Sequence, residues 1–213
     1  MTLTPRAPSP RLVFESHATS LDNEVGLASG WFDVALSTTG EEQARTLGAR
    51  RRDDHLAVVF CSDLSRSFRT AEIAFGDRLL PIIRDARLRE CDYGDLTRQP
   101  TSEIEHRRPL HLVNPFPNGE SYQQVVDRVS GWLSEALPYI DAGTVLIIGH
   151  RATYYALEHL LNRVTLHKAV TSPWTWQPGW TYHLRSSSIS EGGFPALSPR
   201  ASLDLDREPR TQT

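Results

Sequence analysis

Cysteine and lysine are both scarce in this chain of 213 residues. The two cysteines, Cys61 and Cys91, lack the short C-x-x-C spacing of a zinc site. One pair is also too few for a small fold stapled by disulfides. Lys168 is the only lysine, and the other basic residues are arginines. We therefore expect neither a structural metal nor a disulfide framework.

Long apolar runs are missing too. No stretch approaches the ~18 apolar residues of a membrane span, and the opening "MTLTPRAPSP" has no apolar signal segment. A net charge of −3 and an isoelectric point near 6.2 provide no basic field for nucleic acid or for a membrane surface. These absences favour a cytoplasmic enzyme or binding domain with no nucleic-acid or membrane partner.

The composition predicts one folded domain with two tails. Hydrophobic residues make up 39% and charged residues 23%, and the length suits a single core. Residues 1–10 hold three prolines and little to bury, which predicts a flexible arm. Residues 186–213 are rich in Ser, Pro, Gly and charge, which predicts a disordered tail. The catalytic domain is expected over residues 11–185.

Strand and helix patterns alternate through this domain. Short apolar runs predict strands at 11–15, 56–61, 80–85 and 144–150, with an edge strand at 179–184. Helical patterns cover 38–52 (with Thr39 as a candidate cap), 65–75, a long segment from Ser121, and 151–161. Such repeated units predict a doubly wound α/β fold, a mostly parallel sheet with helices on both faces.

Two histidines each follow a predicted strand. His17 comes after the first strand and His150 ends "TVLIIGH". In doubly wound sheets, ligands bind at the carboxyl ends of the strands. A lone histidine in such a place is more often an ordinary loop residue, so the pair gains its meaning from the surrounding sequence.

That surrounding sequence is specific. The segments "SHATSLDN", "GWFDVALSTTGEEQARTLG", "VFCSDLSRSFRTAE", "LRECDYGDL", "PNGESYQQVVDRV" and "VLIIGH" occur in this order. Together they resemble the histidine phosphatase superfamily, branch 1, which is phosphoglycerate-mutase-like. The resemblance runs from about Arg11 to about Leu184.

The resemblance implies phosphoryl transfer through a phosphohistidine, in a phosphoglycerate-mutase-like fold. His17 matches the nucleophile and His150 the second pocket histidine. Arg66 matches an arginine that binds phosphate, and Glu90 matches the general acid. Asn23 stands where the family often places a polar phosphate contact. The implied mechanism needs no metal and no cofactor.

The residues around the nucleophile depart from the family. The family hallmark is Arg-His-Gly, whereas this chain has Ser16-His17-Ala18. The missing arginine would donate charge-assisted hydrogen bonds worth about 1.5–3 kcal/mol each. Its loss therefore weakens phosphate binding by roughly 10- to 100-fold. Ser16 donates one neutral hydrogen bond, and Ala18 adds a Cβ where glycine allows close approach.

Glu15 and Arg151 are two further departures. Glu15 stands where the family has an apolar or small residue, and a buried carboxylate needs a partner. Arg151 follows His150 directly, where glycine is typical. Three roles are open for Arg151: it supplies the charge missing at Ser16, it pairs with Glu15, or it caps its strand facing water.

Other polar and aromatic residues have simpler explanations. Glu120 and Ser121 match a family motif, but "NGES" is also typical of a helix start, which we favour. Trp174, Trp176 and Trp180 line a substrate pocket or pack on the sheet edge. The remaining histidines show no metal-ligand spacing: His55, His106, His111, His159, His167 and His183.

The leading prediction is a phosphomonoester hydrolase of a small, phosphorylated metabolite. The short interval between Glu90 and His150 disfavours a mutase. One alternative keeps the pocket but catalyses a biosynthetic step other than phosphoryl transfer, which the changes at 16, 18 and 151 would favour. Another is a non-catalytic protein that binds a phosphorylated ligand. A homodimer is compatible with the sequence, which does not identify the substrate.

Overall fold

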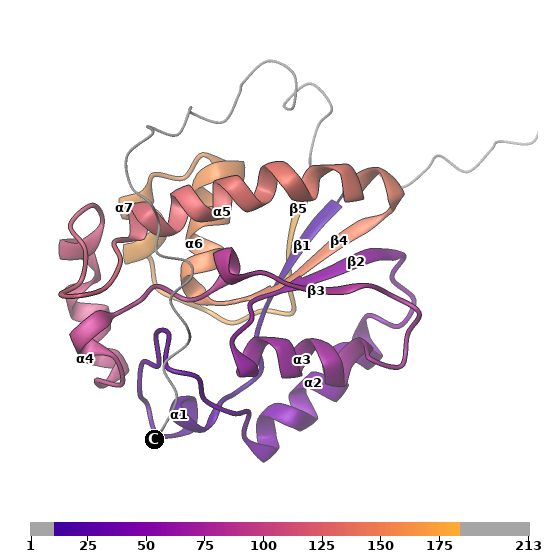
Figure 1. Ribbon diagram of the computed structural model, residues 1–213, viewed down its shortest axis with the longest axis horizontal. Helices are drawn as coiled ribbons and strands as arrows, with labels where there is room; N and C mark the ends of the chain where they lie inside the picture. Colours follow the sequence, from indigo (N-terminus) through magenta and orange to yellow (C-terminus); the bar gives the residue numbers. More distant parts are fainter. Residues whose placement is uncertain (1–10, 184–213) are drawn as a thin grey trace, which may run out of the picture.

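A five-stranded sheet forms the centre of the computed structural model, which describes residues 11–183 (Figure 1). The predicted arm at 1–10, the tail at 186–213 and the last residues of the predicted domain lie outside this range. The strand order is β3-β2-β4-β1-β5. The strands are β1 (Arg11–Ser16), β2 (Leu56–Cys61), β3 (Ile82–Arg84), β4 (Thr144–Gly149) and β5 (Trp180–His183). All neighbours pair in parallel except β5, which is antiparallel to β1. The predicted α/β class is confirmed.

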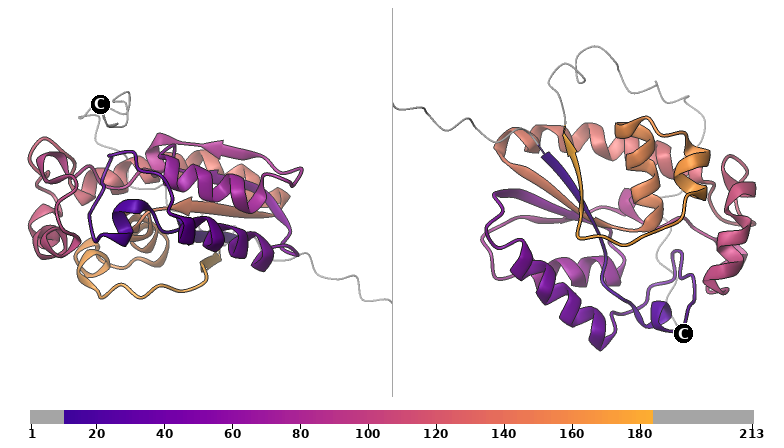
Figure 2. Two further views of the ribbon diagram at one scale, coloured as in Figure 1. Left: turned by 90° about the horizontal axis from the view of Figure 1, so that it is seen from below. Right: turned by 180° about the vertical axis from the view of Figure 1, so that it is seen from behind.

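Helices cover both faces of the sheet, as Figures 1 and 2 show. The helices α2 (Thr38–Arg50) and α3 (Ser65–Phe75) pack together on one face, and α5 (Tyr122–Ala136) and α6 (Arg151–Asn162) on the other. Short helices occupy the connections: α1 (Leu21–Glu24), α4 (Thr101–Arg107), α7 (Leu166–Thr171) and single 3₁₀ turns at Ala86–Leu88, Gly94–Leu96, Arg108–His111 and Leu137–Ala142.

Alternating side chains divide the interior into two cores. Leu12 and Phe14 of β1 face the core under α5 and α6, whereas Val13 faces the core under α2 and α3. This follows from the two-residue period of a strand. Glu15, two residues after Val13, therefore points to the α2–α3 face.

Local capping explains most helix starts. Ser121 caps α5, with its Oγ accepting from the Gln124 N–H at 3.3 Å, which confirms the structural role predicted for it. The predicted cap Thr39 is wrong, because Ser37 has the extended backbone and accepts from the Gly40 N–H at 3.1 Å. The helix also ends at Arg50 rather than at residue 52. The short α4 and α7 were not predicted, because they carry too few apolar positions for a helical period.

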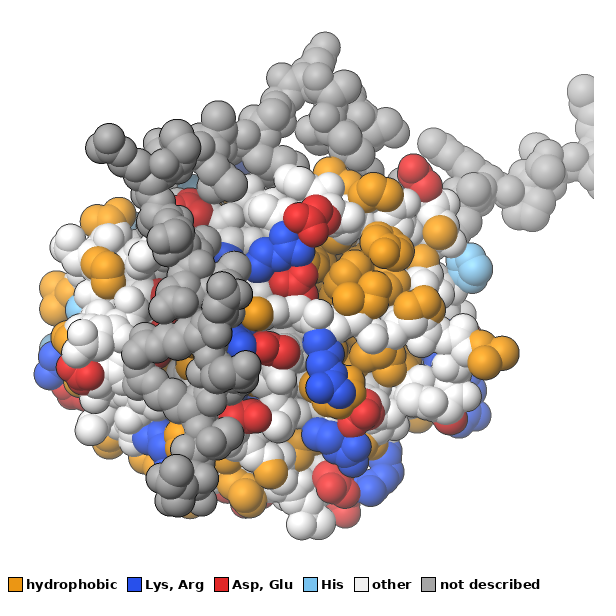
Figure 3. All heavy atoms as spheres, in the orientation of Figure 1, with side chains coloured by type: hydrophobic (Ala, Val, Ile, Leu, Met, Phe, Trp, Pro, Cys, Tyr) orange, Lys and Arg blue, Asp and Glu red, His pale blue; other side chains and the backbone are white. Residues whose placement is uncertain are grey.

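The surface shows no concentration of one charge on the face in Figure 3. Acidic and basic side chains are interspersed there, and hydrophobic side chains gather on one part of it. Within residues 11–183, no helix is long and apolar enough to cross a bilayer.

Gly48 is the basis of a stability test. A Cβ at this position would lie 2.4 Å from the Ala74 carbonyl oxygen of α3, whereas a Cβ on Gly131 of α5 would meet nothing within 4 Å. We expect Gly48→Ala to lower the free energy of unfolding by about 1–3 kcal/mol through overpacking. Gly131→Ala, the matched control, should raise it by about 0.5–1 kcal/mol through helix propensity. Urea unfolding measures both, and a stabilising Gly48→Ala would show that the α2–α3 contact is not tight.

Candidate active site

Two histidines meet because β1 and β4 run in parallel and in register. Ser16 pairs with Gly149, and the His17 N–H donates to the Gly149 carbonyl at 2.9 Å. The next residue of each chain segment is then a histidine, and the ring centroids of His17 and His150 lie 4.9 Å apart. The two rings therefore meet at the carboxyl edge of the sheet, as predicted.

The His17 ring is held in one tautomer. Its Nδ1 lies 2.7 Å from the Ala18 carbonyl oxygen, which only accepts, so Nδ1 carries the hydrogen and Nε2 keeps its lone pair. Burial and the nearby Arg66 guanidinium lower the pKa of His17 to about 3. The imidazole is therefore uncharged near neutral pH, the form in which Nε2 is a nucleophile.

His150 is buried with its ring unpaired. It is 1% exposed, and its backbone N–H donates to Thr153 Oγ1 at 3.2 Å. Neither ring nitrogen has a hydrogen-bond partner within residues 11–183. Burial, Arg66 and His17 hold the pKa of His150 well below its usual range. Buried polar atoms without partners are uncommon, so this ring is prepared for a ligand.

Arg66 supplies a buried positive charge beside both rings. It is 2% exposed, at the start of α3, and donates to the carbonyls of Gly30 at 2.8 Å and Phe32 at 3.0 Å. In the part of the chain that the structure describes, no carboxylate lies within ion-pair distance of it. A buried cation that meets only carbonyls favours an incoming anion.

Glu90 approaches the two histidines from the connection between β3 and α4. Its Oε1 accepts from the Cys91 N–H at 2.8 Å and from the Ala152 N–H at 3.2 Å, in the first turn of α6. The amide of Ala152 follows directly after His150 and Arg151, so the carboxylate lies at the α6 N-terminus. Both bonds use Oε1, which leaves Oε2 to face a ligand.

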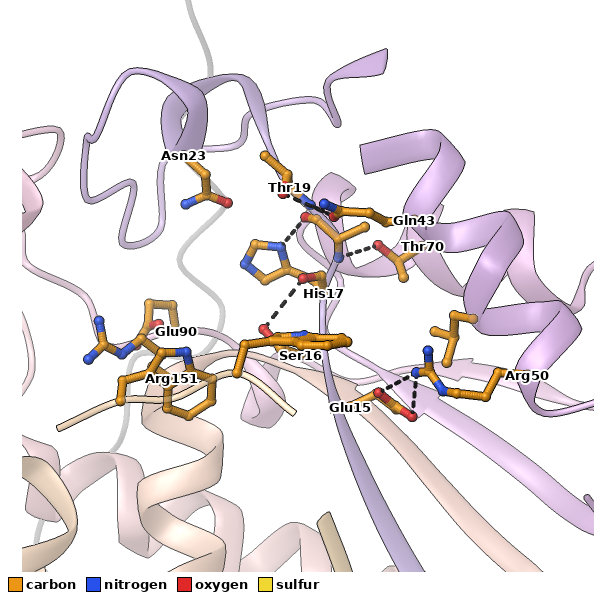
Figure 4. A pocket seen from close by; sticks show the side chains of 14 residues that line it. Glu15, Ser16, His17, Thr19, Asn23, Gln43, Arg50, Thr70, Glu90 and Arg151 are labelled. Atoms are coloured by element: carbon orange, nitrogen blue, oxygen red, sulfur yellow. Dashed lines mark hydrogen bonds and ion pairs between the residues drawn. The ribbon is translucent and has the colours of Figure 1, made fainter. Parts of the chain in front are cut away.

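A cavity of about 530 Å³ opens over these groups (Figure 4). Ser16, His17, Asn23, Glu90 and Arg151, all predicted site residues, line it. Arg66 and His150 are not among its lining residues, which matches their near-complete burial. The volume exceeds that of a phosphate group and falls in the range of small-molecule sites.

Three lining residues that the sequence did not single out hold the loop that follows His17. Gln43 Oε1 accepts from both the N–H and the hydroxyl of Thr19 at 3.0 Å, and Thr70 Oγ1 accepts from the Ala18 N–H at 3.0 Å. Gln43 and Thr70 both lie within the quoted family segments, which was the available signal. Their spacing from His17 carries no information until the helices are placed.

Asn23 stabilises the start of a helix and also lines the cavity. Its Oδ1 accepts from the Ser20 N–H at 3.1 Å, and Ser20 Oγ accepts from the Asn23 N–H at 3.2 Å. This reciprocal pair starts α1. The amide nitrogen of the side chain is left for a ligand in the cavity.

Glu15 and Arg151 have separate partners. Glu15 is 2% exposed and pairs with Arg50 at 3.0 Å and Arg51 at 2.6 Å. Arg151 donates to Glu105 at 2.8 Å and lies 5.3 Å from the centre of the Trp174 ring. The suggested pairing of Arg151 with Glu15 is therefore wrong, because Glu15 pairs with Arg50 and Arg51 and Arg151 pairs with Glu105.

The tryptophans divide between the two predicted roles. Trp174 and Trp176 line the cavity. Trp180 lies on the edge strand β5, with its ring 5.6 Å from Phe14 and 5.0 Å from Tyr154.

Among residues 11–183, no group of three or more potential ligand side chains is placed to hold a metal ion.

The low histidine pKa values predict a pH-dependent stability. For a histidine at about 3 when folded and 6.5 when unfolded, the unfolded chain binds more protons between these values. The free energy of unfolding should therefore rise with pH across this window, by up to about 1.4 kcal/mol per pH unit for each histidine. We expect His17→Asn and His150→Asn each to flatten this rise in urea titrations.

His106→Asn, which removes an exposed histidine on α4, is the control for this measurement. Equal pH slopes in the wild type and in both active-site variants would contradict neutral burial of the two rings.

The sequence is similar to known phosphatases and phosphoglycerate mutases. The histidine phosphatase superfamily (branch 1) matches residues 12–177. The chain is 36% identical over 128 residues to the uncharacterized phosphatase PhoE of Bacillus subtilis, covering 60% of this chain and 65% of that protein, just under two thirds of its length. It is 32% identical to phosphoserine phosphatase 1 of Hydrogenobacter thermophilus, covering 69% and 75%. It is 35% identical to a 2,3-bisphosphoglycerate-dependent phosphoglycerate mutase of Tropheryma whipplei, covering 70% and 82%.

Solved structures show the same fold. YhfR of Bacillus stearothermophilus superposes with a TM-score of 0.71 at 28% identity, covering 80% of this chain and 89% of that one. A mycobacterial glucosyl-3-phosphoglycerate phosphatase gives 0.68 at 22% identity, covering 76% and 86%. The predicted resemblance is confirmed, and so is the predicted class of histidine phosphatase-like enzyme. The chain belongs to the histidine phosphatase superfamily, branch 1.

Proposed function

We propose that this protein hydrolyses a small phosphate monoester through a phosphohistidine on His17. The observation that carries the proposal is the pair of uncharged histidine rings, 4.9 Å apart, beside a buried arginine that forms no ion pair within the described residues. Such a site favours an anion, and the hydrogen bond at His17 Nδ1 leaves the lone pair of that ring on Nε2.

The reaction has two steps. His17 Nε2 attacks phosphorus as the bond to the ester oxygen breaks, and Glu90, protonated at Oε2, gives its proton to the leaving oxygen. Water then attacks the phosphohistidine while Glu90 takes back a proton, which releases inorganic phosphate and restores the imidazole. Arg66 and His150 bind the phosphoryl oxygens, with Asn23 as a further contact.

His150 changes charge in this scheme. It is neutral in the empty site because burial, Arg66 and His17 disfavour its cation. An incoming dianion favours the protonated ring, which then donates a charged hydrogen bond. Proton uptake therefore supplies part of the charge that the absent family arginine would provide.

Ser16 favours a second candidate function. With serine there, the residue that precedes His17 carries no charge, and a reaction other than phosphoryl transfer, on a less anionic substrate, would fit this charge balance. Phosphatase assays distinguish the two candidate functions. A cytoplasmic location and a homodimer stay predictions from the sequence.

The first test of function removes the nucleophile. His17→Ala should abolish release of phosphate from phenyl phosphate, because it removes the Nε2 lone pair that attacks phosphorus in the proposed reaction. The wild type, quenched during turnover with a ³²P-labelled ester, should yield an acid-labile, base-stable label that His17→Ala lacks. Arg69→Ala, on the exposed side of α3, is a matched control and should keep its activity. Turnover that persists in clean His17→Ala would exclude the phosphohistidine.

The second test restores the missing charge. Ser16→Arg should raise kcat/KM on phenyl phosphate by roughly 10- to 100-fold, the worth of one charged hydrogen bond or two. Ser16→Gln adds similar bulk without charge and should give no such gain. Wild-type hydrolysis that Ser16→Arg leaves unchanged would show that proton uptake on His150 already satisfies the phosphate. Absence of phosphatase activity in both proteins would favour the second candidate function.

A further inference from the structure

Glu90 lies on a connection that is neither helix nor strand. Residues 89–93 separate the 3₁₀ turns Ala86–Leu88 and Gly94–Leu96. A general acid acts only when its proton-bearing oxygen lies within hydrogen-bond distance of the leaving oxygen. On an irregular segment, that precision must come from contacts with the elements around it.

Two buried side chains donate to the Glu90 carbonyl oxygen. Trp31 Nε1 donates to it at 2.7 Å and Arg128 Nη2 at 2.9 Å. The donors come from distant parts of the chain, because Trp31 lies between α1 and α2 and Arg128 lies on α5. Both lone pairs of this oxygen are therefore used, which fixes the plane of its peptide group.

The same peptide group carries an N–H that holds the carboxylate. The Glu90 C=O and the Cys91 N–H lie in one peptide plane, and the Cys91 N–H donates to Glu90 Oε1 at 2.8 Å. The two donors at the carbonyl therefore also set the direction of this N–H. The Ala152 N–H, at 3.2 Å, is the second donor to Oε1, and Oε2 is left for the ligand.

The loop that carries Trp31 is bound to Arg66. The Arg66 guanidinium donates to the carbonyls of Gly30 and Phe32, the two neighbours of Trp31, at 2.8 Å and 3.0 Å. One loop therefore contacts both the cation that binds the phosphoryl oxygens in the proposed reaction and the acid that protonates the leaving oxygen. The distance between these two groups depends on this loop.

The orientation of the Trp31 ring is fixed by its surroundings. The ring is buried, and the Arg89 guanidinium lies 4.6 Å from its centre. Arg89 is itself held by Asp63, to which its Nε donates at 2.8 Å. A buried indole N–H needs an acceptor, and for Trp31 this acceptor is the Glu90 carbonyl.

Arg128 is held by a carboxylate in the same core. Its Nε and Nη2 donate to Glu120 Oε1 at 3.0 Å and Oε2 at 3.1 Å. Its Nη1 donates to the Arg87 carbonyl at 2.6 Å, and Glu120 Oε2 accepts from the Asp92 N–H at 3.0 Å. The pair thus binds the connection on both sides of Glu90. A buried ion pair is often no more stabilising than apolar residues of similar size, so its contacts with this connection indicate a positional role.

We propose that Trp31 and Arg128 are positioning residues for Glu90, which hold its peptide group so that Oε2 meets the leaving oxygen of the substrate. This inference rests on the proposed function, in which Glu90 is the general acid. Neither side chain is among those that line the cavity of His17. The carbonyls that Arg66 contacts belong to the backbone, so they stay when the Trp31 side chain is changed.

The test compares two esters that differ in their need for a proton. Trp31→Phe removes the indole N–H and keeps an aromatic ring beside Arg89. We expect kcat/KM for phenyl phosphate to fall by about 10-fold, because phenolate leaves poorly without a proton. For 2,4-dinitrophenyl phosphate, whose phenolate leaves unprotonated, kcat/KM should change by less than about 2-fold. Arg128→Lys, which cannot reach the Arg87 and Glu90 carbonyls together, should show the same selectivity.

Trp132→Phe is the matched control. Trp132 is also buried, on α5, but its Nε1 has no hydrogen-bond partner within residues 11–183. The same substitution there leaves both donors to the Glu90 carbonyl in place, so the ratio of kcat/KM for the two esters should not change. Equal losses on both esters in Trp31→Phe would show a general defect of the fold and refute the positioning role.

A double variant tests whether Trp31 acts through Glu90. Glu90→Gln removes the proton donor, so there is no acid left to position. Adding Trp31→Phe to Glu90→Gln should lower kcat/KM for phenyl phosphate by less than about 2-fold. A further loss of about 10-fold in the double variant would show that Trp31 acts independently of Glu90, which would refute the inference.

Hydrogen exchange of the substrate-free protein separates this inference from the proposed function. In Trp31→Phe, the Ala152 N–H should exchange about 10-fold faster, because its acceptor Glu90 Oε1 is no longer held in place. The Tyr154 N–H of the same helix, which donates to the His150 carbonyl at 3.1 Å, should keep its rate. This result would stand even if the wild type hydrolysed no phosphate ester, which would refute the proposed function alone. Unchanged exchange of the Ala152 N–H would refute the positioning role, whether or not the enzyme hydrolyses phenyl phosphate.

Discussion

The site depends on the parallel pairing of β1 with β4. His17 and His150 are far apart in the sequence, and only the register of Ser16 with Gly149 brings the next residue of each segment together. A slip of one residue would also turn every β1 side chain to the opposite face. Glu15 would then enter the apolar core under α5 and α6 instead of meeting its arginines at the end of α2. One register thus sets both the meeting of the two histidines and the burial of the carboxylate at residue 15.

Charge around the nucleophile is distributed unevenly. The arginines of the cavity wall, Arg50 and Arg151, each hold a carboxylate, whereas Arg66 holds only carbonyls. Both histidines are neutral in the empty site because burial, and then the charge of Arg66, lowers the pKa of each ring. An anion must therefore be met by one fixed cation and by protons taken up on binding.

Much of the fold could be predicted from the local sequence pattern. Buried parallel strands appear in the sequence as short apolar runs, and the apolar residues of α5 recur at helical spacing. The strand-end histidines followed from the same pattern, and the family segments added Arg66 and Glu90. The partners of Glu15 and Arg151 could not be predicted. Arg50 and Arg51 lie at the end of α2, which the sequence predicted to continue to residue 52. Glu105 lies on the short α4, which was not predicted. Ion pairs between such elements depend on tertiary placement, which spacing does not encode.

The two departures next to the nucleophile have different physical effects. Ser16 leaves the residue before His17 without charge, whereas Glu15 forms buried ion pairs with Arg50 and Arg51 beside the cavity. Gly179 has a φ of +85°, and a Cβ there would lie 2.2 Å from Arg51 Nη2 and 3.0 Å from Glu15 Oε1. The loop that presents Trp174 and Trp176 to the cavity therefore ends directly against the buried Glu15–Arg51 pair. A carboxylate at residue 15 thus links the strand that carries the nucleophile, the end of α2 and the tryptophan loop. The arginines nearest to this carboxylate, Arg50 and Arg51, therefore support the cavity wall through an ion pair.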